Sequence, residues 1–251
     1  MARRATPEDN AQTTRAGSAS AGPASASLPA SSAREHLTRP RVVAAALAIV
    51  DRDGLDGLTM RALGRELGVD PMAAYHWFPN KFAILQGVSE AILSEISADG
   101  VESATDWLAV ARTMAVEYRA ALLRHPNAIP VASTQPVMTP RGFELIERIA
   151  AQMVRRGWTP GAAMEAINTI AAFVIGVCVV QAGVSPGSEP VTEDKIMEVY
   201  SAIDPTRFPT LVAAVAELGD ANIDEIAQFD RALEATLRGM DAVYRERGML
   251  R

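Results

Sequence analysis

The chain has 251 residues, 49% of them hydrophobic, and a formal net charge of −6. A chain of this size can bury a sizeable core as one large domain or two small ones. Its single cysteine, Cys178, excludes an intrachain disulfide and a thiolate metal cluster, which fits a reducing cytoplasm. The longest apolar run, 170–180, is shorter than the roughly 20 residues of a membrane-spanning helix, so it predicts a buried helix.

Composition and charge divide the chain into three expected parts: 1–35, 36–81 and 82–251. Residues 1–35 are rich in Ala, Ser, Thr and Pro and lack the apolar stretch of a secretory signal, which predicts a disordered tail. Residues 34–81 carry seven Lys or Arg and six Asp or Glu, whereas residues 82–251 carry 14 and 22. The resulting charges of +1 and −8 are uneven, but +1 is only a faint signal for a polyanionic partner.

Capping residues predict three short helices before residue 80. The first covers about 39–54, where a threonine can cap the first N–H groups, a proline suits the first turn and a glycine ends the helix. The second, MRALGREL over 60–67, lies between Thr59 and a glycine. The third covers about 71–78, after an aspartate cap and before Pro79. Two short helices separated by about three residues form a helix-turn-helix.

The sequence also predicts helices after residue 80. A fourth helix to about residue 96 would bury one face, formed by Phe82, Leu85, Val88, Ile92 and Ile96. The last would bury Ile226, Phe229, Leu233, Leu237, Met240 and Tyr244. The predicted ranges are about 80–96, 105–124 with a Thr105 cap, 140–156, 160–182, 193–202, 207–218 and 223–246. Because no strand alternation or internal repeat occurs, we expect an all-α fold.

Four consecutive large side chains, Tyr75, His76, Trp77 and Phe78, lie in the third helix. They are too many for one buried face, so some must point outward. A short helix fits the DNA major groove, about 12 Å wide, with polar side chains reaching phosphates. The alternative is packing against the first two helices. We favour packing for Ala74 and Phe78, which are four residues apart, and DNA contact for Tyr75 and His76.

Residues 58–81, LTMRALGRELGVDPMAAYHWFPNK, closely resemble the DNA-binding motif of the TetR family of bacterial transcriptional regulators. In that motif LTxRxLAxxLGV precedes a short recognition helix, a tyrosine and an N-K pair. The resemblance covers 39–97 strongly. More weakly, YRAALLRHP, MVRRGW and FDRALEATLRGMDAVY resemble the tetracycline-repressor branch. The family resemblance implies an N-terminal three-helix DNA-binding domain and a C-terminal ligand-binding and dimerisation domain. Proteins of this kind are ligand-responsive regulators, and most of them are repressors.

The resemblance also implies which residues contact DNA. Thr59 and Tyr75 would touch phosphates, Lys81 would contact the backbone, and Arg61 could reach a base. The remaining reading or positioning would fall to Pro71, Met72, Ala73, His76 and Trp77. Met-Ala-Ala stands where the tetracycline repressor carries more polar groups, so we expect a different operator with more apolar contacts to thymine methyl groups.

Members of the family pair through two C-terminal helices, here about 160–182 and 223–246. The segment AINTIAAFVIGVCVVQ is apolar on nearly all sides, which suits a helix covered both by its own domain and by a partner. A two-fold homodimer would also match a palindromic operator. The alternative is the central helix of a monomeric bundle.

The resemblance places an effector pocket among the helices of 82–182, with Met114 and Tyr118 lining it, and Ile149 and Met153 by a looser alignment. These methionines could equally be core filler. In that branch, a histidine and a carboxylate bind magnesium–tetracycline. Their positions correspond to places near Ala132 and Val180 in this chain. The metal-binding residues are therefore missing, unless His125 moves into the site. We expect no metal or cofactor, and a largely apolar effector such as an aromatic or polyketide-like small molecule.

Two other function classes are alternatives to a DNA-binding regulator. An enzyme would need an activated nucleophile or a metal set, but no HExxH, GxSxG or phosphate-binding glycine loop occurs, and Cys178 lies in an apolar helix. A helical interaction or small-molecule-binding module without DNA binding is the other alternative. The sequence favours a cytoplasmic DNA-binding regulator with no membrane contact.

Overall fold

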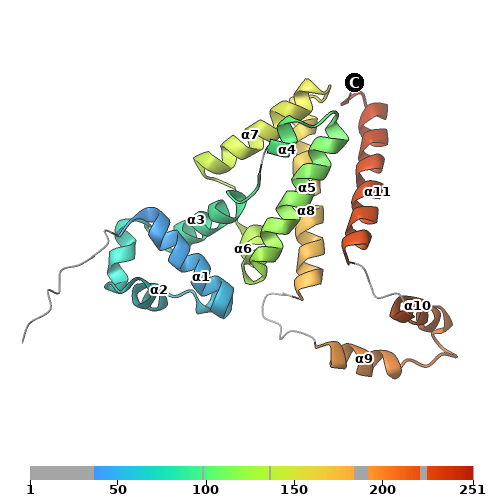
Figure 1. The fold of residues 1–251 in the computed structure, drawn as a ribbon, viewed down its shortest axis with the longest axis horizontal. Coiled ribbons are helices and arrows are strands. Elements are labelled where there is room, and N and C mark those ends of the chain that lie inside the picture. Colours follow the sequence, from blue (N-terminus) through green and yellow to red (C-terminus); the bar gives the residue numbers. More distant parts are fainter. Residues whose placement is uncertain (1–36, 98, 136, 184–191, 221–224, 251) are drawn as a thin grey trace, which may run out of the picture. The chain divides into compact units, whose positions relative to one another are not determined.

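The computed structural model describes residues 37–97, 99–135, 137–183, 192–220 and 225–250. Helices are the only regular elements within these ranges, which confirms the all-α fold (Figure 1). Leu37–Arg251 form one compact unit. The expected tail, 1–35, lies outside the described residues.

Three short elements open the described chain, and each begins at a side-chain cap. They are α1 (Arg39–Gly57), α2 (Met60–Leu67) and the 3-10 helix η1 (Pro71–His76). The hydroxyl of Thr38 accepts a hydrogen bond from the N–H of Arg41 at 3.4 Å. The hydroxyl of Thr59 accepts from Ala62 at 3.1 Å. These caps satisfy N–H groups that have no partner within a helix, so the predicted starting points are confirmed.

The structure adds detail to two of these elements. The third element is a 3-10 helix, because its N–H groups bond three residues back: Ala73 to the carbonyl of Asp70 at 2.9 Å, and Trp77 to that of Ala74 at 3.0 Å. Six residues is long for this tighter geometry, which seldom continues beyond three or four residues. The first helix is interrupted at its predicted end, Gly54, with φ 73° and ψ 178°, and helical structure then resumes as far as Gly57.

The fourth predicted helix is α3 (Lys81–Leu93), which ends before Ile96. Its buried stripe is Ile84, Val88 and Ile92. The predicted face was wrong at Phe82, whose side chain is 51% exposed. The reason is the close approach of α1 at Gly87, where an added Cβ would lie 2.6 Å from the Cγ2 of Val43. This approach turns the helix so that Phe82 faces outward.

Nine further elements lie in the described residues from 99 onward. They are α4 (Asp99–Glu102), α5 (Trp107–Arg124), η2 (Pro126–Ala128), α6 (Ile129–Thr134), α7 (Pro140–Arg155), α8 (Pro160–Ala182), α9 (Glu193–Ser201), α10 (Pro209–Asp220) and α11 (Glu225–Glu246). Thr105 is not the cap of α5: Asp106 accepts from the N–H of Ala109 at 2.8 Å. The elements α4, η2 and α6 were not predicted, because such short helices leave no readable apolar period.

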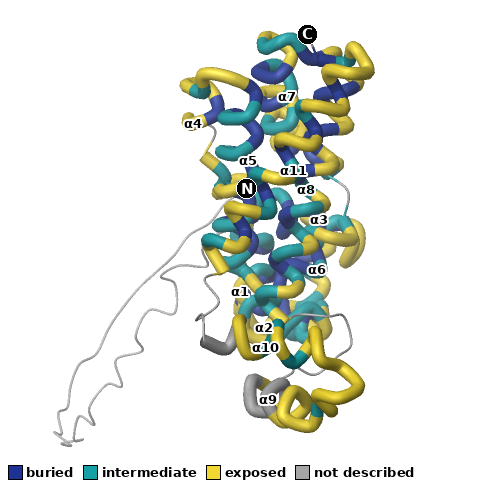
Figure 2. The backbone as a smooth tube through the Cα atoms, turned by 90° about the vertical axis from the view of Figure 1, so that its right-hand side faces the viewer, coloured by how far each residue is buried: buried dark blue, intermediate teal, exposed yellow. Residues whose placement is uncertain are grey.

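The core surrounds α8, which packs against α5, α6, α7 and α11 (Figure 1). Within the described ranges, α8 is long and apolar enough to cross a membrane. It packs against four neighbouring helices, and 33% of its most apolar window is buried, so the predicted burial holds for only one side of the helix. Along these helices buried and exposed stretches alternate, as Figure 2 shows, because each presents one face to the core. On α11, the expected stripe from Phe229 to Tyr244 is buried, but Ile226 is 63% exposed.

Candidate functional site

The helix-turn-helix is held together by a close contact between α2 and η1. Gly64 of α2 lies against the start of η1, where an added Cβ would be 2.9 Å from both N and Cα of Pro71. The N–H of Val69 bonds to the carbonyl of Gly64 at 3.0 Å. Gly68 ends α2 with φ 67°, a conformation that favours glycine. The two elements therefore have a fixed relative position.

The four large side chains at 75–78 separate into one buried and three exposed groups. Phe78 and Ala74 are fully buried, which confirms their predicted packing. Tyr75 is 39% and Trp77 38% exposed. The exposed ring of His76 meets the Trp77 ring edge-on, with centroids 5.6 Å apart. Phe78 thus anchors η1 to the core while its three neighbours project into solvent.

The other predicted DNA contacts lie around this surface. Thr59, Arg61 and Lys81 are exposed, Met72 is 68% exposed, and two residues of η1, Pro71 and Ala73, are half-buried. In the part of the chain that the structure describes, no ion pair or hydrogen bond of the Arg61 or Lys81 side chain is found. The hydroxyl of Thr59 already caps α2. The surface therefore offers free cations and exposed rings, the groups that contact phosphates and bases.

A further cation at this surface, Arg65, was not predicted. It is exposed on α2, one turn after Arg61. Residues four apart lie on the same face of a helix, so the position of Arg65 beside Arg61 could have been predicted from the sequence. Arg52, by contrast, is engaged: its guanidinium bonds to Asp53 at 3.0 Å and to Glu66 at 3.2 Å, joining α1 to α2.

The four predicted effector residues lie in the core where α5 packs against α7 and α8. Met114 and Tyr118 come from α5, and Ile149 and Met153 from α7, and all are buried. Burial, with the Cys178 sulfur nearby, raises the pKa of Tyr118 to about 12. The Tyr118 hydroxyl therefore keeps its proton at neutral pH and can donate a hydrogen bond inside an otherwise apolar region.

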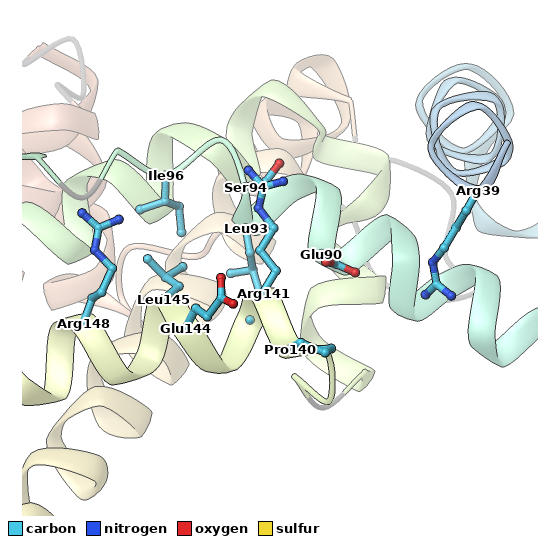
Figure 3. Close-up of a pocket in the computed structure, with 11 residues that line it drawn as sticks. Arg39, Glu90, Leu93, Ser94, Ile96, Pro140, Arg141, Glu144, Leu145 and Arg148 are labelled. Carbon is cyan, nitrogen blue, oxygen red and sulfur yellow. The ribbon is translucent and has the colours of Figure 1, made fainter.

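A separate groove of about 740 Å³ lies between α3 and α7, with Arg39 of α1 at one end. Figure 3 shows Arg141 reaching from α7 toward Ser94, while Arg39 and Glu90 extend from α1 and α3. Carboxylates and guanidinium groups alternate along it, and none of the four predicted effector residues lines it. Its polar lining distinguishes it from the apolar core.

Among the described residues, no group of three or more His, Cys, Asp or Glu side chains could hold a metal ion. The Nδ1 of His125 lies 2.8 Å from an oxygen of Asp51, and its Nε2 lies 2.8 Å from an oxygen of Glu95. The side chain is thus tied to α1 and to the residues after α3 rather than turned toward α6.

Two family models match the chain. Residues 42–88 match the bacterial regulatory proteins of the tetR family, and residues 100–244 match the tetracyclin repressor-like C-terminal domain. The second match alone covers more than half of the chain. Together the two matches contain α2, η1 and the first part of α3, as well as the core helices α5, α7 and α8.

Individual proteins resemble the chain over shorter or longer parts. The HTH-type transcriptional repressor DrrR1 of Streptomyces coeruleorubidus is 33% identical over 56% of this chain and 52% of its own, so the match spans about half of that relative. The class A tetracycline repressor from transposon 1721 of Escherichia coli is 36% identical over 59% of this chain and 69% of its own. The structure of the Streptomyces coelicolor protein ActR with actinorhodin has a TM-score of 0.68 at 25% identity, covering 83% of this chain and 97% of ActR.

Proposed function

The chain belongs to the TetR family of bacterial regulatory proteins, and from this premise we propose that it is a cytoplasmic repressor that leaves a palindromic operator when a small, largely apolar effector binds. As a member of this family it is a ligand-responsive DNA-binding regulator and not an enzyme. In this proposal residues 36–81 read DNA, and residues 82–251 bind the effector and form the dimer.

The observation that carries the proposal is the surface of α2 and η1. Tyr75, His76 and Trp77 are exposed on a short element whose position is fixed by Gly64 and Phe78. Contiguous exposed apolar groups of this kind mark interaction sites, whereas single exposed ones are common on any protein surface. Together with Arg61 and Lys81, they supply the phosphate and base contacts that a helix-turn-helix makes in the major groove. Thr59 would contribute a phosphate contact from the cap of α2.

A homodimer through α8 and α11 is part of the proposal. On α8 the residues Ala172, Gly176 and Val180 follow one another at four-residue steps, and Val180 is 79% exposed. On α11 small exposed residues follow the same spacing at Ala235 and Gly239. Added Cβ atoms at both glycines would meet nothing within 4 Å. Such small, apolar surfaces suit close helix packing against a second copy.

The effector site of this proposal is the core around Met114, Tyr118, Ile149 and Met153. The flexible thioethers can rearrange around an apolar molecule, and the Tyr118 hydroxyl can orient it. The relative ActR, seen with actinorhodin, supports a small-molecule site in a fold of this kind. Because the four side chains are buried, the effector would have to separate α5 from α7.

Such a separation would reach the DNA-binding surface through α3. This helix packs against α1, α5, α6 and α7, and it follows η1 directly, with Asn80 capping its start by a 2.9 Å hydrogen bond from Ala83. A ligand that prefers one position of α3 weakens operator binding by the difference between its affinities for the two arrangements.

The experiment that tests the proposal is selection of bound sites from random duplex DNA with purified protein. We expect enrichment of one palindromic sequence whose half-sites are separated by about one helical turn. Enrichment of a single unpaired half-site would contradict the dimer. No enrichment by folded protein would favour the interaction module without DNA binding.

A further inference from the structure

His125 occupies a position that the sequence fixes closely. It is the residue after α5, and because Pro126 follows it, the backbone must leave the helical region there. Its φ and ψ are −128° and 60°, and its N–H bonds to the carbonyl of Leu122 at 3.0 Å. The imidazole is therefore presented from a defined point at the end of α5.

The ring of His125 joins two carboxylates from separate elements. Nδ1 lies 2.8 Å from Oδ2 of Asp51 on α1, and Nε2 lies 2.8 Å from Oε1 of Glu95, two residues after α3. Ionised carboxylates only accept hydrogen bonds, so both contacts require a donor on each ring nitrogen. A neutral imidazole has one donor, whereas the protonated ring has two.

The two carboxylate residues are held in place by further hydrogen bonds. Arg124 donates to the other oxygen of Glu95 at 2.6 Å, and the side chain of Asn127 donates to the backbone carbonyl of Asp51 at 2.8 Å. Oδ1 of Asp51 is buried and has no hydrogen-bond partner in the described part of the chain. Asp51, Glu95 and Arg124 are thus the charged groups that face His125, and they sum to one negative charge.

We propose that His125 is a positioning residue for operator binding: its protonated ring ties α1 and the end of α3 to α5, and thereby limits the positions that η1 can take. The inference rests on the proposed function. Its structural basis is that α1 packs against α3 and that α2 packs against both α1 and η1. Asp51 of α1 and Glu95, two residues after α3, both contact the residue that follows α5.

The direction of the pH dependence follows from the charge balance. Burial disfavours the charged ring, but the hydrogen bonds with Glu95 and Asp51 and their negative charges outweigh it, so the pKa of His125 is raised above its ordinary value. A raised pKa means that the tie is complete at pH values below the ordinary histidine range and is lost as pH rises through the folded-state pKa. Operator affinity should therefore fall toward alkaline pH.

The test is an anisotropy titration of the selected operator at a series of pH values from about 6 to about 9, at constant ionic strength. The proteins are the unmodified chain and the variants His125→Gln, Asp51→Asn and the double variant. His76→Gln tests whether the second described histidine, which lies at the DNA surface, causes the pH dependence of operator affinity. Asp56→Asn is the matched control, since it removes one charge from an exposed position of α1 outside the cluster.

We expect His125→Gln to weaken operator binding at the lowest pH by about fivefold or more, the lower end of typical coupling between sites, and to flatten the pH profile. Asp51→Asn should do the same, and the double variant should cost no more than either alone. Asp56→Asn and His76→Gln should retain the alkaline loss of affinity.

Two results would overturn the inference. One is an unchanged affinity and pH profile in His125→Gln while the unmodified chain binds its operator. The other is full additivity of the two substitutions. Circular dichroism of each variant at the assay temperature verifies that it is folded. Failure of the unmodified chain to bind any selected DNA would instead refute the proposed function.

Discussion

Removal of the buried ring and removal of an exposed ring at 75–78 should lower the free energy of unfolding by different amounts. Phe78 is fully buried beneath η1, whereas Trp77 is 38% exposed. Phe78→Ala should therefore lower the free energy of unfolding by about 3–5 kcal/mol, the cost of a buried phenylalanine truncated to alanine. Trp77→Ala should cost about 1 kcal/mol or less. Urea unfolding measures both, and an equal loss in the two variants would contradict the assignment of Phe78 as the anchor of η1.

Cys178 gives a second prediction at the residue scale. Burial raises the pKa of this thiol to about 11, although the nearby Arg119 charge acts in the opposite direction. At about pH 8 the folded protein should therefore react slowly with a thiol reagent, because the thiolate is the reactive form and the sulfur is inaccessible. Full reaction is expected in denaturant. Rapid labelling of the native protein would show that the core around α8 opens readily.

At the scale of the helices, the sequence predicted best where a side chain acts on its own neighbours. The caps at Thr38, Thr59 and Asn80 and the stop at Gly68 follow from local chemistry, and the structure contains all of them. The face of α3 was mistaken at Phe82, because its orientation depends on the long-range contact between Gly87 and Val43. Local patterns do not reveal such contacts.

The same distinction holds for the candidate sites. The exposure of Tyr75 and His76 could be predicted, because too many large groups follow one another for a single buried face. The junction around His125 could not, since Asp51, Glu95 and His125 are far apart in the sequence. The packing of η2 against α1 and of α3 against α5 brings them together.

The contact between α2 and η1 carries a prediction of its own. Gly64→Ala should add helix propensity worth up to about 1 kcal/mol, yet its Cβ would lie 2.9 Å from the backbone of Pro71. Backbone atoms cannot move aside as a flexible side chain can, so η1 should shift and operator affinity should fall. Gly161→Ala is the matched control, because a Cβ there meets nothing within 4 Å. Unimpaired operator binding by Gly64→Ala, measured by anisotropy, would refute this account of the contact.

For the whole molecule, the proposed dimer can be separated from the fold of one chain. Gly176→Arg places a charged side chain where the single chain leaves open space, so the helix content should not change. Across a dimer interface the same charge would be buried without a partner, which should weaken self-association by about 100-fold or more. Sedimentation measures the change, with Gly161→Arg as the control on the same helix. A dimer that persists unchanged would place the interface elsewhere.

The central claim is that the exposed face of η1 binds an operator, and one titration tests it most directly. The selected duplex would be titrated with the unmodified chain, with Tyr75→Ala, and with Tyr200→Ala, which removes an exposed tyrosine from α9. A lost hydrogen bond to a charged phosphate should weaken binding by about tenfold or more. The account predicts this loss for Tyr75→Ala alone. Equal operator affinities of all three proteins would contradict it.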